Sequence, residues 1–155
     1  MLKSIEGNFD NLEVNELLSK HFIELRAASP EGSAHVLDIS GLKVSSIKFW
    51  SLWNEGKLIG CGALKFLDKE HGEFKSIRIH DNFRNQGQGI NVINHLINEA
   101  KKLKIKRLSI ETGASDFFIP ARKLFKKTGF TVCEPFAHYK KDINSVYLTM
   151  LINNS

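Results

Sequence analysis

Apolar residues recur at three- and four-residue intervals in three parts of the chain, which is the spacing of an amphipathic helix. The first part covers residues 11–28, with Asp10 as the expected N-cap. The second covers residues 90–103 and the third residues 119–128. The sequence therefore predicts three helices, and residues 33–44 fit a short helix followed by a loop.

Strand-like runs occupy much of the remaining chain. Residues 47–53 and 57–66 flank Asn54-Glu55-Gly56, a hairpin signal because Asn and Gly tolerate the positive φ of tight turns. A turn at residues 68–72 leads to a third run, residues 73–80, so these three strands are expected to form an antiparallel meander. Shorter strands are predicted at residues 107–111, 130–133 and 145–152.

The third strand contains a break in its alternation of apolar and polar residues. Phe74 lies at an even position, whereas Ile77 and Ile79 lie at odd ones. One extra residue in a strand moves all later side chains to the opposite face, so we expect a β-bulge here. The order strand, helix, strand over residues 73–111 predicts a parallel pair joined by a right-handed crossover.

The loop between that strand and the next helix has the features of an anion site. Arg84, Gly87 and Gly89 precede the helix, and no acidic residue lies between Phe83 and Ile97. A helix N-terminus presents unpaired N–H groups and a positive dipole end to a ligand. The dinucleotide fingerprint fails because it needs glycine at position 92, and the P-loop ending is absent. A simple tight turn remains the alternative.

Length, composition and charge narrow the class of protein. The chain has 155 residues, 42% hydrophobic and 25% charged, which suits one domain over residues 1–155. No stretch is apolar enough to span a bilayer and the N-terminus lacks a signal peptide, so a cytoplasmic protein without membrane contact is expected. The net charge of +5 favours an anionic ligand or nucleic acid without separating them. Cys61 and Cys133 are expected to be free, buried thiols.

Together, the motifs resemble the GCN5-related N-acetyltransferase (GNAT) family. Arg84-Asn85-Gln86-Gly87-Gln88-Gly89 is similar to its R-x-x-G-x-G acyl-CoA loop, and the PARKLFKKTGF segment, residues 120–130, is similar to its A-x-x-L-Y-x-x-x-G-F ending. SIRIHDNF before the loop and RLSIET after the helix also resemble family strands. The resemblance is dense over residues 56–132, and several short motifs resemble a small bacterial subgroup.

The resemblance implies an α/β fold: a central, mostly antiparallel sheet with a splayed parallel strand pair, flanked by helices. It implies acetyl-CoA as co-substrate, with the pyrophosphate on the loop and the pantetheine between the splayed strands. The backbone N–H near Ile79 would then stabilise the oxyanion. The implied acetyl-CoA contacts are Ile77, Ile79, Arg84, Asn85, Gln86, Gly87, Gln88, Gly89, Ile90, Thr112, Phe118, Ala121 and Phe125.

Acetyl transfer to an amine requires a neutral amine and therefore a base. Glu73, before the expected bulge, stands where many GNAT enzymes carry a glutamate base. A solvated carboxylate at a strand end is the alternative for Glu73. Glu24, Asp38 and Glu111 are weaker candidates for the base.

Two positions depart from the family pattern. The usual tyrosine acid, which reprotonates the thiolate of CoA, is replaced by Phe125, and a frequent asparagine is replaced by Phe118. Tyr139 is predicted to reach the active site instead, and a surface or gating role is the alternative for it. Tyr147 fits simple packing in the sheet. The other open choice is whether the thiolate, with an ordinary thiol pKa of about 8.5, leaves without an acid.

The remaining polar and aromatic residues add little chemistry. The six histidines include no i, i+4 pair, so no metal is expected, and His35 and His138 are possible acceptor contacts. The basic run at residues 101–107 fits a solvated helix end or a contact to the 3′-phosphate of CoA. Aromatic residues 49, 50 and 53 fit a core or a subunit contact, which makes a homodimer conceivable.

The leading hypothesis is an acetyl-CoA-dependent N-acetyltransferase in which an unidentified amine attacks the thioester directly in a ternary complex. No acyl-cysteine is expected, because neither cysteine has a nucleophile setting. The alternative is a GNAT-fold module that binds or senses CoA without turnover. A basic nucleic-acid binder follows from charge alone and lacks the interleaved aromatics of such proteins, so no nucleic-acid partner is expected.

Overall fold

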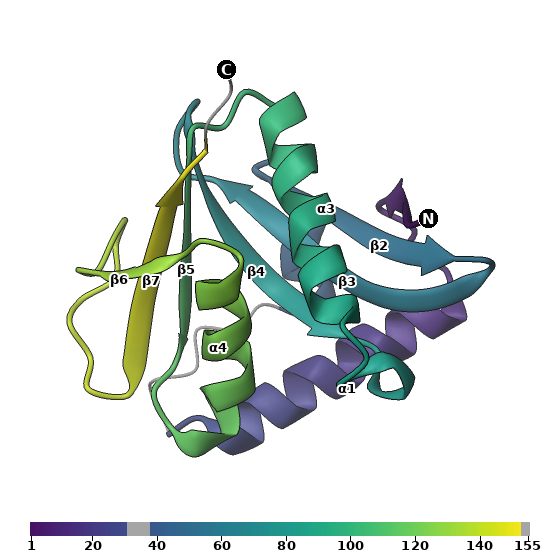
Figure 1. Cartoon of the computed structure of the whole chain (residues 1–155), viewed down its shortest axis with the longest axis horizontal. Helices are drawn as coiled ribbons and strands as arrows, with labels where there is room; N and C mark the ends of the chain where they lie inside the picture. Colours follow the sequence, from purple (N-terminus) through teal and green to yellow (C-terminus); the bar gives the residue numbers. More distant parts are fainter. Residues whose placement is uncertain (31–37, 153–155) are drawn as a thin grey trace.

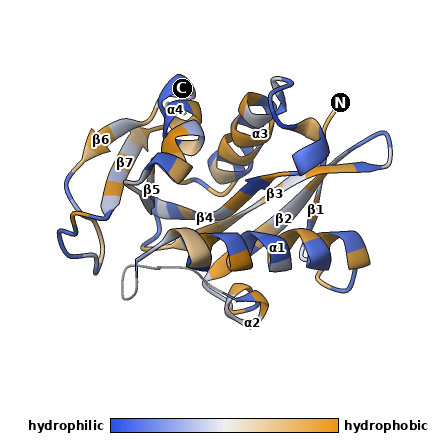
Figure 2. Ribbon diagram, turned by 90° about the horizontal axis from the view of Figure 1, so that it is seen from below, coloured by the Kyte–Doolittle hydropathy of each residue, from blue (hydrophilic) through white to orange (hydrophobic). Residues whose placement is uncertain are grey.

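The computed structural model describes residues 1–30 and 38–152. A seven-stranded sheet in the order β1-β2-β3-β4-β5-β7-β6 carries helices on both faces (Figure 1). Helices α1 and α2 lie on one face and helices α3 and α4 on the other (Figure 2). The elements are β1 (Lys3–Glu6), α1 (Leu12–Ala28), α2 (Ile39–Leu42), β2 (Ile47–Asn54), β3 (Lys57–Phe66), β4 (His71–Ile79), η1 (Asp81–Phe83), α3 (Gln88–Lys102), β5 (Arg107–Gly113), η2 (Asp116–Phe118), α4 (Ile119–Lys127), β6 (Thr131–Cys133) and β7 (Ser145–Leu151).

Helix α1 begins one residue later than its sequence signal suggested. Asn11, not Asp10, is the N-cap, because its side chain accepts a hydrogen bond from the Val14 N–H at 3.1 Å. Asp38 caps the short helix α2 in the same way, through the Gly41 N–H at 2.8 Å. Helix α2 is therefore the short helix expected within residues 33–44, and residues 33–37 of that segment lie outside the described part of the chain.

The β2–β3 hairpin is confirmed, but its turn uses Glu55 rather than Asn54 beside Gly56. The positive φ angles fall on Glu55 (52°) and Gly56 (77°), while Asn54 ends β2. Two consecutive positive φ angles match the handedness of a twisted hairpin. Phe49 and Trp50 on β2 are buried in the core, so the aromatic cluster offers no exposed patch in support of a dimer.

The β-bulge in β4 is also confirmed. Cys61 pairs with Arg78 and Ala63 with Lys75, so two β4 residues face Gly62 alone. Ser76, one of the two, has a φ of 54°. After the bulge, Arg78 turns toward α1, while Ile77 and Ile79 pack on the core beneath α3.

Strands β4 and β5 are parallel, as predicted, but pair over only three residues. The pairs are His71 with Arg107, Gly72 with Leu108, and Glu73 with Ser109. Beyond Glu73 and Ser109 the two strands separate, and the gap between them is called the splay. The splay opens toward the N-terminus of α3, because β4 leads directly into the loop that precedes that helix.

The C-terminal strands lie in the sheet in an order that differs from their order in the sequence. β7 pairs with both β5 and β6, so the last strand inserts between two earlier ones. The sequence predicted both strands but not this order, and it missed the edge strand β1. Both cysteines are free as expected, although Cys133 is only partly buried. Among the described residues, no helix is long and apolar enough to cross a membrane.

Candidate active site

A cavity of about 1010 Å³ passes through the splay and reaches both faces of the sheet. On one side its walls come from the loop before α3, from the start of α3 and from α4. On the other side they come from the C-terminal half of α1. Between the two, its walls are β4 after Glu73 and β5 after Ser109, the segments that no longer pair with each other. The cavity therefore has two arms, an α3 arm and an α1 arm, which meet in the splay.

The α3 arm ends in an anion site. Gly87, with a φ of 78°, is the N-cap of α3, and as a glycine it has no side chain that could accept from the first N–H groups of the helix. The first N–H groups of α3 are thus left for a ligand, where the helix dipole favours negative charge. Asn85, with a φ of 62°, and Gly89 line the same arm. Lys123 and Lys127 on α4 add positive charge to the cavity wall.

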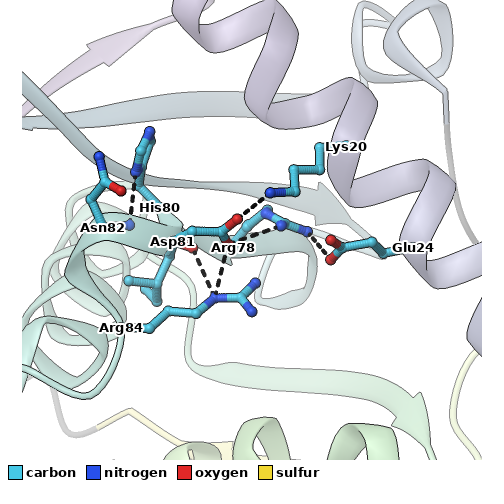
Figure 3. Close-up of polar contacts among 8 residues, drawn as sticks. Lys20, Glu24, Arg78, His80, Asp81, Asn82 and Arg84 are labelled. Atoms are coloured by element: carbon cyan, nitrogen blue, oxygen red, sulfur yellow. Dashed lines mark hydrogen bonds and ion pairs between the residues drawn. The ribbon is translucent and has the colours of Figure 1, made fainter.

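Arg84 belongs to a charged network that ties this loop to α1 (Figure 3). Its Nε lies 3.3 Å from the Asp81 carboxylate and donates to the Ile79 carbonyl at 3.4 Å. Asp81 also accepts from Lys20 of α1 and, at 3.2 Å, from Arg78. The hydrogen bond from Lys20 and the nearby arginines lower the pKa of Asp81, so its charge persists. The network orients the Arg84 guanidinium beside the anion site.

Most of the predicted acetyl-CoA contacts lie on this cavity. Gln86 and Gln88 do not line it: the Gln86 amide donates to the Asn82 carbonyl at 3.0 Å, and the Gln88 side chain pairs with Asn91 at 3.4 Å. The predicted residues that do line it are Ile77, Ile79, Arg84, Asn85, Gly87, Gly89, Ile90, Thr112, Phe118, Ala121 and Phe125.

The Ile79 backbone faces the splay. The His80 N–H donates to the Ile59 carbonyl at 2.7 Å, and Ile79 pairs with Gly60. Because hydrogen-bonded and non-hydrogen-bonded pairs alternate in antiparallel strands, the N–H of Ile79 points away from β3. It points to the side on which β5 no longer pairs with β4. This geometry agrees with an oxyanion donor at that position.

The two phenylalanines that depart from the family pattern are built into the wall. Phe118 packs directly on Gly113, where a Cβ would meet its ring at 2.1 Å. Phe125 is buried, with its ring centroid 5.9 Å from that of Phe130 in the core. Both rings therefore supply shape to the cavity, and neither can donate a proton.

The two predicted catalytic residues contact each other. The Tyr139 hydroxyl donates to Glu73 Oε2 at 2.5 Å, and Lys75 Nζ lies 3.3 Å from the same oxygen and 3.1 Å from the tyrosine oxygen. Burial, and then the neighbouring Glu73 charge, raise the pKa of Tyr139, so its phenol stays protonated. Glu73 is only 1% exposed, and neither it nor Tyr139 lines the cavity. Lys75, which the sequence analysis missed, is the member of this trio on the cavity wall.

The three weaker candidates for the base differ in whether they line the cavity and in which groups bind them. Asp38 caps α2, and Glu24 is held by Arg78 at 2.8 Å, a hydrogen bond that lowers the pKa of Glu24. Glu111 lines the cavity from β5 and accepts a hydrogen bond from Ser145 Oγ at 2.7 Å.

The histidines lie differently from the sequence expectations, whereas the basic run forms the expected exposed helix end. His138 stacks on Tyr139, away from the main cavity, and His35 lies outside the described residues. His21, which no motif marked, lines the α1 arm at 8% exposure, and burial together with Arg78 lowers its pKa to about 4. The basic run at residues 101–107 lies at the far end of α3 and does not line the cavity.

A sheet with a splayed parallel pair, a cavity through the splay and an anion site at one end define an acyl-CoA transferase architecture. The chain matches the model of the acetyltransferase (GNAT) family over residues 13–130. It therefore belongs to the GNAT family, which confirms the predicted fold and the predicted enzyme class, an N-acyltransferase.

Relatives of similar length support the family membership. The chain is 44% identical over 137 residues to the uncharacterized N-acetyltransferase YsnE of Bacillus subtilis, which covers 88% of this chain and 91% of that protein. It is 37% identical over 139 residues to the uncharacterized N-acetyltransferase YedL of Escherichia coli, covering 90% and 87%. A Bacillus subtilis acetyltransferase solved in complex with CoA shares the fold, with a TM-score of 0.71, 21% identity and coverage of 99% and 100%.

Proposed function

We propose that this enzyme transfers the acetyl group of acetyl-CoA to a primary amine that enters through the α1 arm. The observation that carries this proposal is the single cavity that joins the anion site at α3 to the α1 face through the splay. A long thioester substrate entering from one side and an amine from the other would meet in the splay. A B. subtilis acetyltransferase of the same fold was solved in complex with CoA, which supports CoA as a ligand of this fold.

Each part of the α3 arm suits one part of acetyl-CoA. The pyrophosphate carries negative charge, for which the uncapped α3 N-terminus, Arg84 and Gly87 provide donors. The pantetheine is long and thin, and the splay offers unpaired backbone groups of β4 and β5 for its amides. Phe118 and Phe125 supply apolar walls, so the site is shaped to exclude water around the thioester.

The reaction proceeds by direct attack in a ternary complex. The nitrogen of the neutral amine forms a bond to the thioester carbon, and the carbon–sulfur bond breaks with release of the CoA thiolate. The extra proton on the nitrogen passes to solvent, from which the thiolate is reprotonated. The Ile79 N–H stabilises the carbonyl oxygen as negative charge develops on it. A thiolate with a pKa of about 8.5 is a good leaving group, so Phe125 in place of a tyrosine does not prevent transfer.

Glu73 and Tyr139 act in this proposal as positioning residues. Because Glu73 is buried and does not line the cavity, it does not touch the acceptor. Its carboxyl group and the Tyr139 hydroxyl instead hold the Lys75 ammonium at the wall. This arrangement replaces the direct base role expected for Glu73.

Thiol release from acetyl-CoA over a panel of amines tests the proposal. In Gly89→Leu the new side chain points at Leu124, because even a Cβ at Gly89 would lie 2.7 Å from that residue. It should therefore close the α3 arm and abolish both acetyl-CoA binding and turnover. Gln88→Leu, in the same helical turn but outside the cavity, is the matched control and should retain both. Saturable CoA binding with no turnover of any amine would instead favour a sensing module.

A further inference from the structure

Two opposite charges, one on β4 and one on β5, line the cavity beyond the last paired residues of these strands. Glu73 and Ser109 are the last paired residues of β4 and β5, and Lys75 and Glu111 each follow two residues later. Side chains of a strand alternate between faces with a period of two, so Lys75 and Glu111 point to the same face. Both line the cavity.

That face is the α1 side, away from the N-terminus of α3. Phe74 and Ile110, the residues immediately before Lys75 and Glu111, belong to the core beneath α3. Lys75 and Glu111 therefore lie on the opposite side of the sheet, in the α1 arm, which the proposed function gives to the acceptor.

Both charges are held in place by fixed neighbours. Lys75 contacts Glu73 and Tyr139, and its side chain is 12% exposed. Glu111 accepts from Ser145 on the neighbouring strand β7. Charged groups fixed by their neighbours lose little freedom on binding a ligand, which favours specific recognition.

Among the described residues of the α1 arm, the other charged groups, Glu24 and Arg78, are paired with each other. The Arg78 guanidinium is tied to Glu24 and Asp81. His21 is neutral near pH 7, because its pKa is lowered to about 4. Ala28 and Leu25 add small, apolar surface. The wall thus combines one positive and one negative anchor with a compact apolar lining.

We infer that the acceptor is a small amine that carries its own carboxylate, as an amino acid does, with its amine at Glu111 and its carboxylate at Lys75. Glu111 accepts a proton from the ammonium of the acceptor, which leaves the nitrogen lone pair for attack on the thioester. Lys75 holds the carboxylate by a charge-assisted hydrogen bond. This inference rests on the proposed function and names its substrate class.

The test compares amino acids with the corresponding amino-acid amides, which keep the amine and lose the carboxylate charge. Thiol release from acetyl-CoA is measured with both sets for the wild type, Lys75→Met and Glu111→Gln. The wild type should prefer an amino acid over its amide by about 10- to 100-fold in kcat/KM, the range expected for one charged hydrogen bond. Lys75→Met should reduce this preference to nearly none, so that an amino acid and its amide are turned over at similar rates.

Glu111→Gln should lower kcat for every acceptor at neutral pH, because the acceptor ammonium can then lose its proton only to solvent. Lys123→Met, on the α4 wall, is the control and should leave the acceptor preference unchanged. Calorimetry with acetyl-CoA accompanies each variant, so a loss of folding or of acetyl-CoA binding is seen directly.

Three results would overturn the inference: equal turnover of amides and amino acids by the wild type, a preference that survives in Lys75→Met, or acetyl-CoA binding without turnover of any amino acid. None of these three results contradicts the proposed binding of acetyl-CoA in the α3 arm. Absence of acetyl-CoA binding by the folded wild type would instead reject the proposed function itself.

Discussion

Replacing Tyr139 with phenylalanine tests whether the buried Glu73 trio stabilises the fold. The substitution keeps the ring contacts to Phe136 and Tyr147, at 5.1 and 5.8 Å, and removes one oxygen atom. Glu73 Oε2 loses its 2.5 Å hydrogen bond, and Lys75 loses an acceptor at 3.1 Å. Glu73 Oε1 is already buried with no hydrogen-bond partner in the described chain, so the carboxyl group has little to replace the lost donor.

A hydrogen bond to a charged, buried group contributes about 1.5–3 kcal/mol, so Tyr139→Phe should lower the free energy of unfolding by that amount. For a chain of this size, each kcal/mol corresponds to roughly 2–4 °C in Tm. Urea denaturation at pH 7 measures the first quantity and calorimetry the second.

Tyr147→Phe is the matched control. Its hydroxyl donates to the neutral carbonyl of Lys140 at 2.8 Å, so a smaller loss, about 1 kcal/mol, is expected. A loss below about 0.5 kcal/mol in Tyr139→Phe, or equal losses in the two variants, would refute the reasoning about the buried carboxyl group.

Three further predictions follow from the cavity walls. Because the pKa of His21 is lowered from 6.5 to about 4, the neutral imidazole stabilises the folded protein fully above pH 6.5, and about 3 kcal/mol of this stability is lost as the pH falls toward 4. His21→Gln should therefore flatten the plot of unfolding free energy, measured in urea, against pH between 6.5 and 4. An unchanged slope would contradict this assignment of His21. Gly113→Ala should drive the Phe118 ring into the cavity and weaken acetyl-CoA binding in calorimetry, with rescue by the added change Phe118→Leu; a wild-type Kd in the single variant would count against the wall assignment. Arg84→Met should weaken CoA binding and reduce its salt dependence, and an unaltered salt slope would remove Arg84 from the anion site.

The sequence predicted those features that short segments encode by themselves. The R-x-x-G-x-G loop needs positive φ angles at Asn85 and Gly87, and both residue types tolerate them. The shift of apolar parity between Phe74 and Ile77 can be read directly as a bulge. Each signal spans fewer than about ten residues, so the chemistry of those residues was sufficient.

Features that depend on distant contacts could not be predicted in this way. Tyr139 and Glu73 are 66 positions apart, and their hydrogen bond requires β7 to insert between β5 and β6. The burial of Glu73, which argues against a direct base role, follows from the same packing. His21 shows no sequence signal, because its low pKa comes from burial in the folded chain and, after that, from the nearby Arg78.

Calorimetric titration of the wild-type protein with acetyl-CoA, and separately with free CoA, tests whether the α3 arm and the splay bind CoA. Both ligands should bind saturably at a single site with micromolar affinity, because both carry the pyrophosphate and pantetheine that fit the α3 arm and the splay. Folded protein that gives no saturable heat with either ligand at millimolar concentration would contradict the assignment of the cavity.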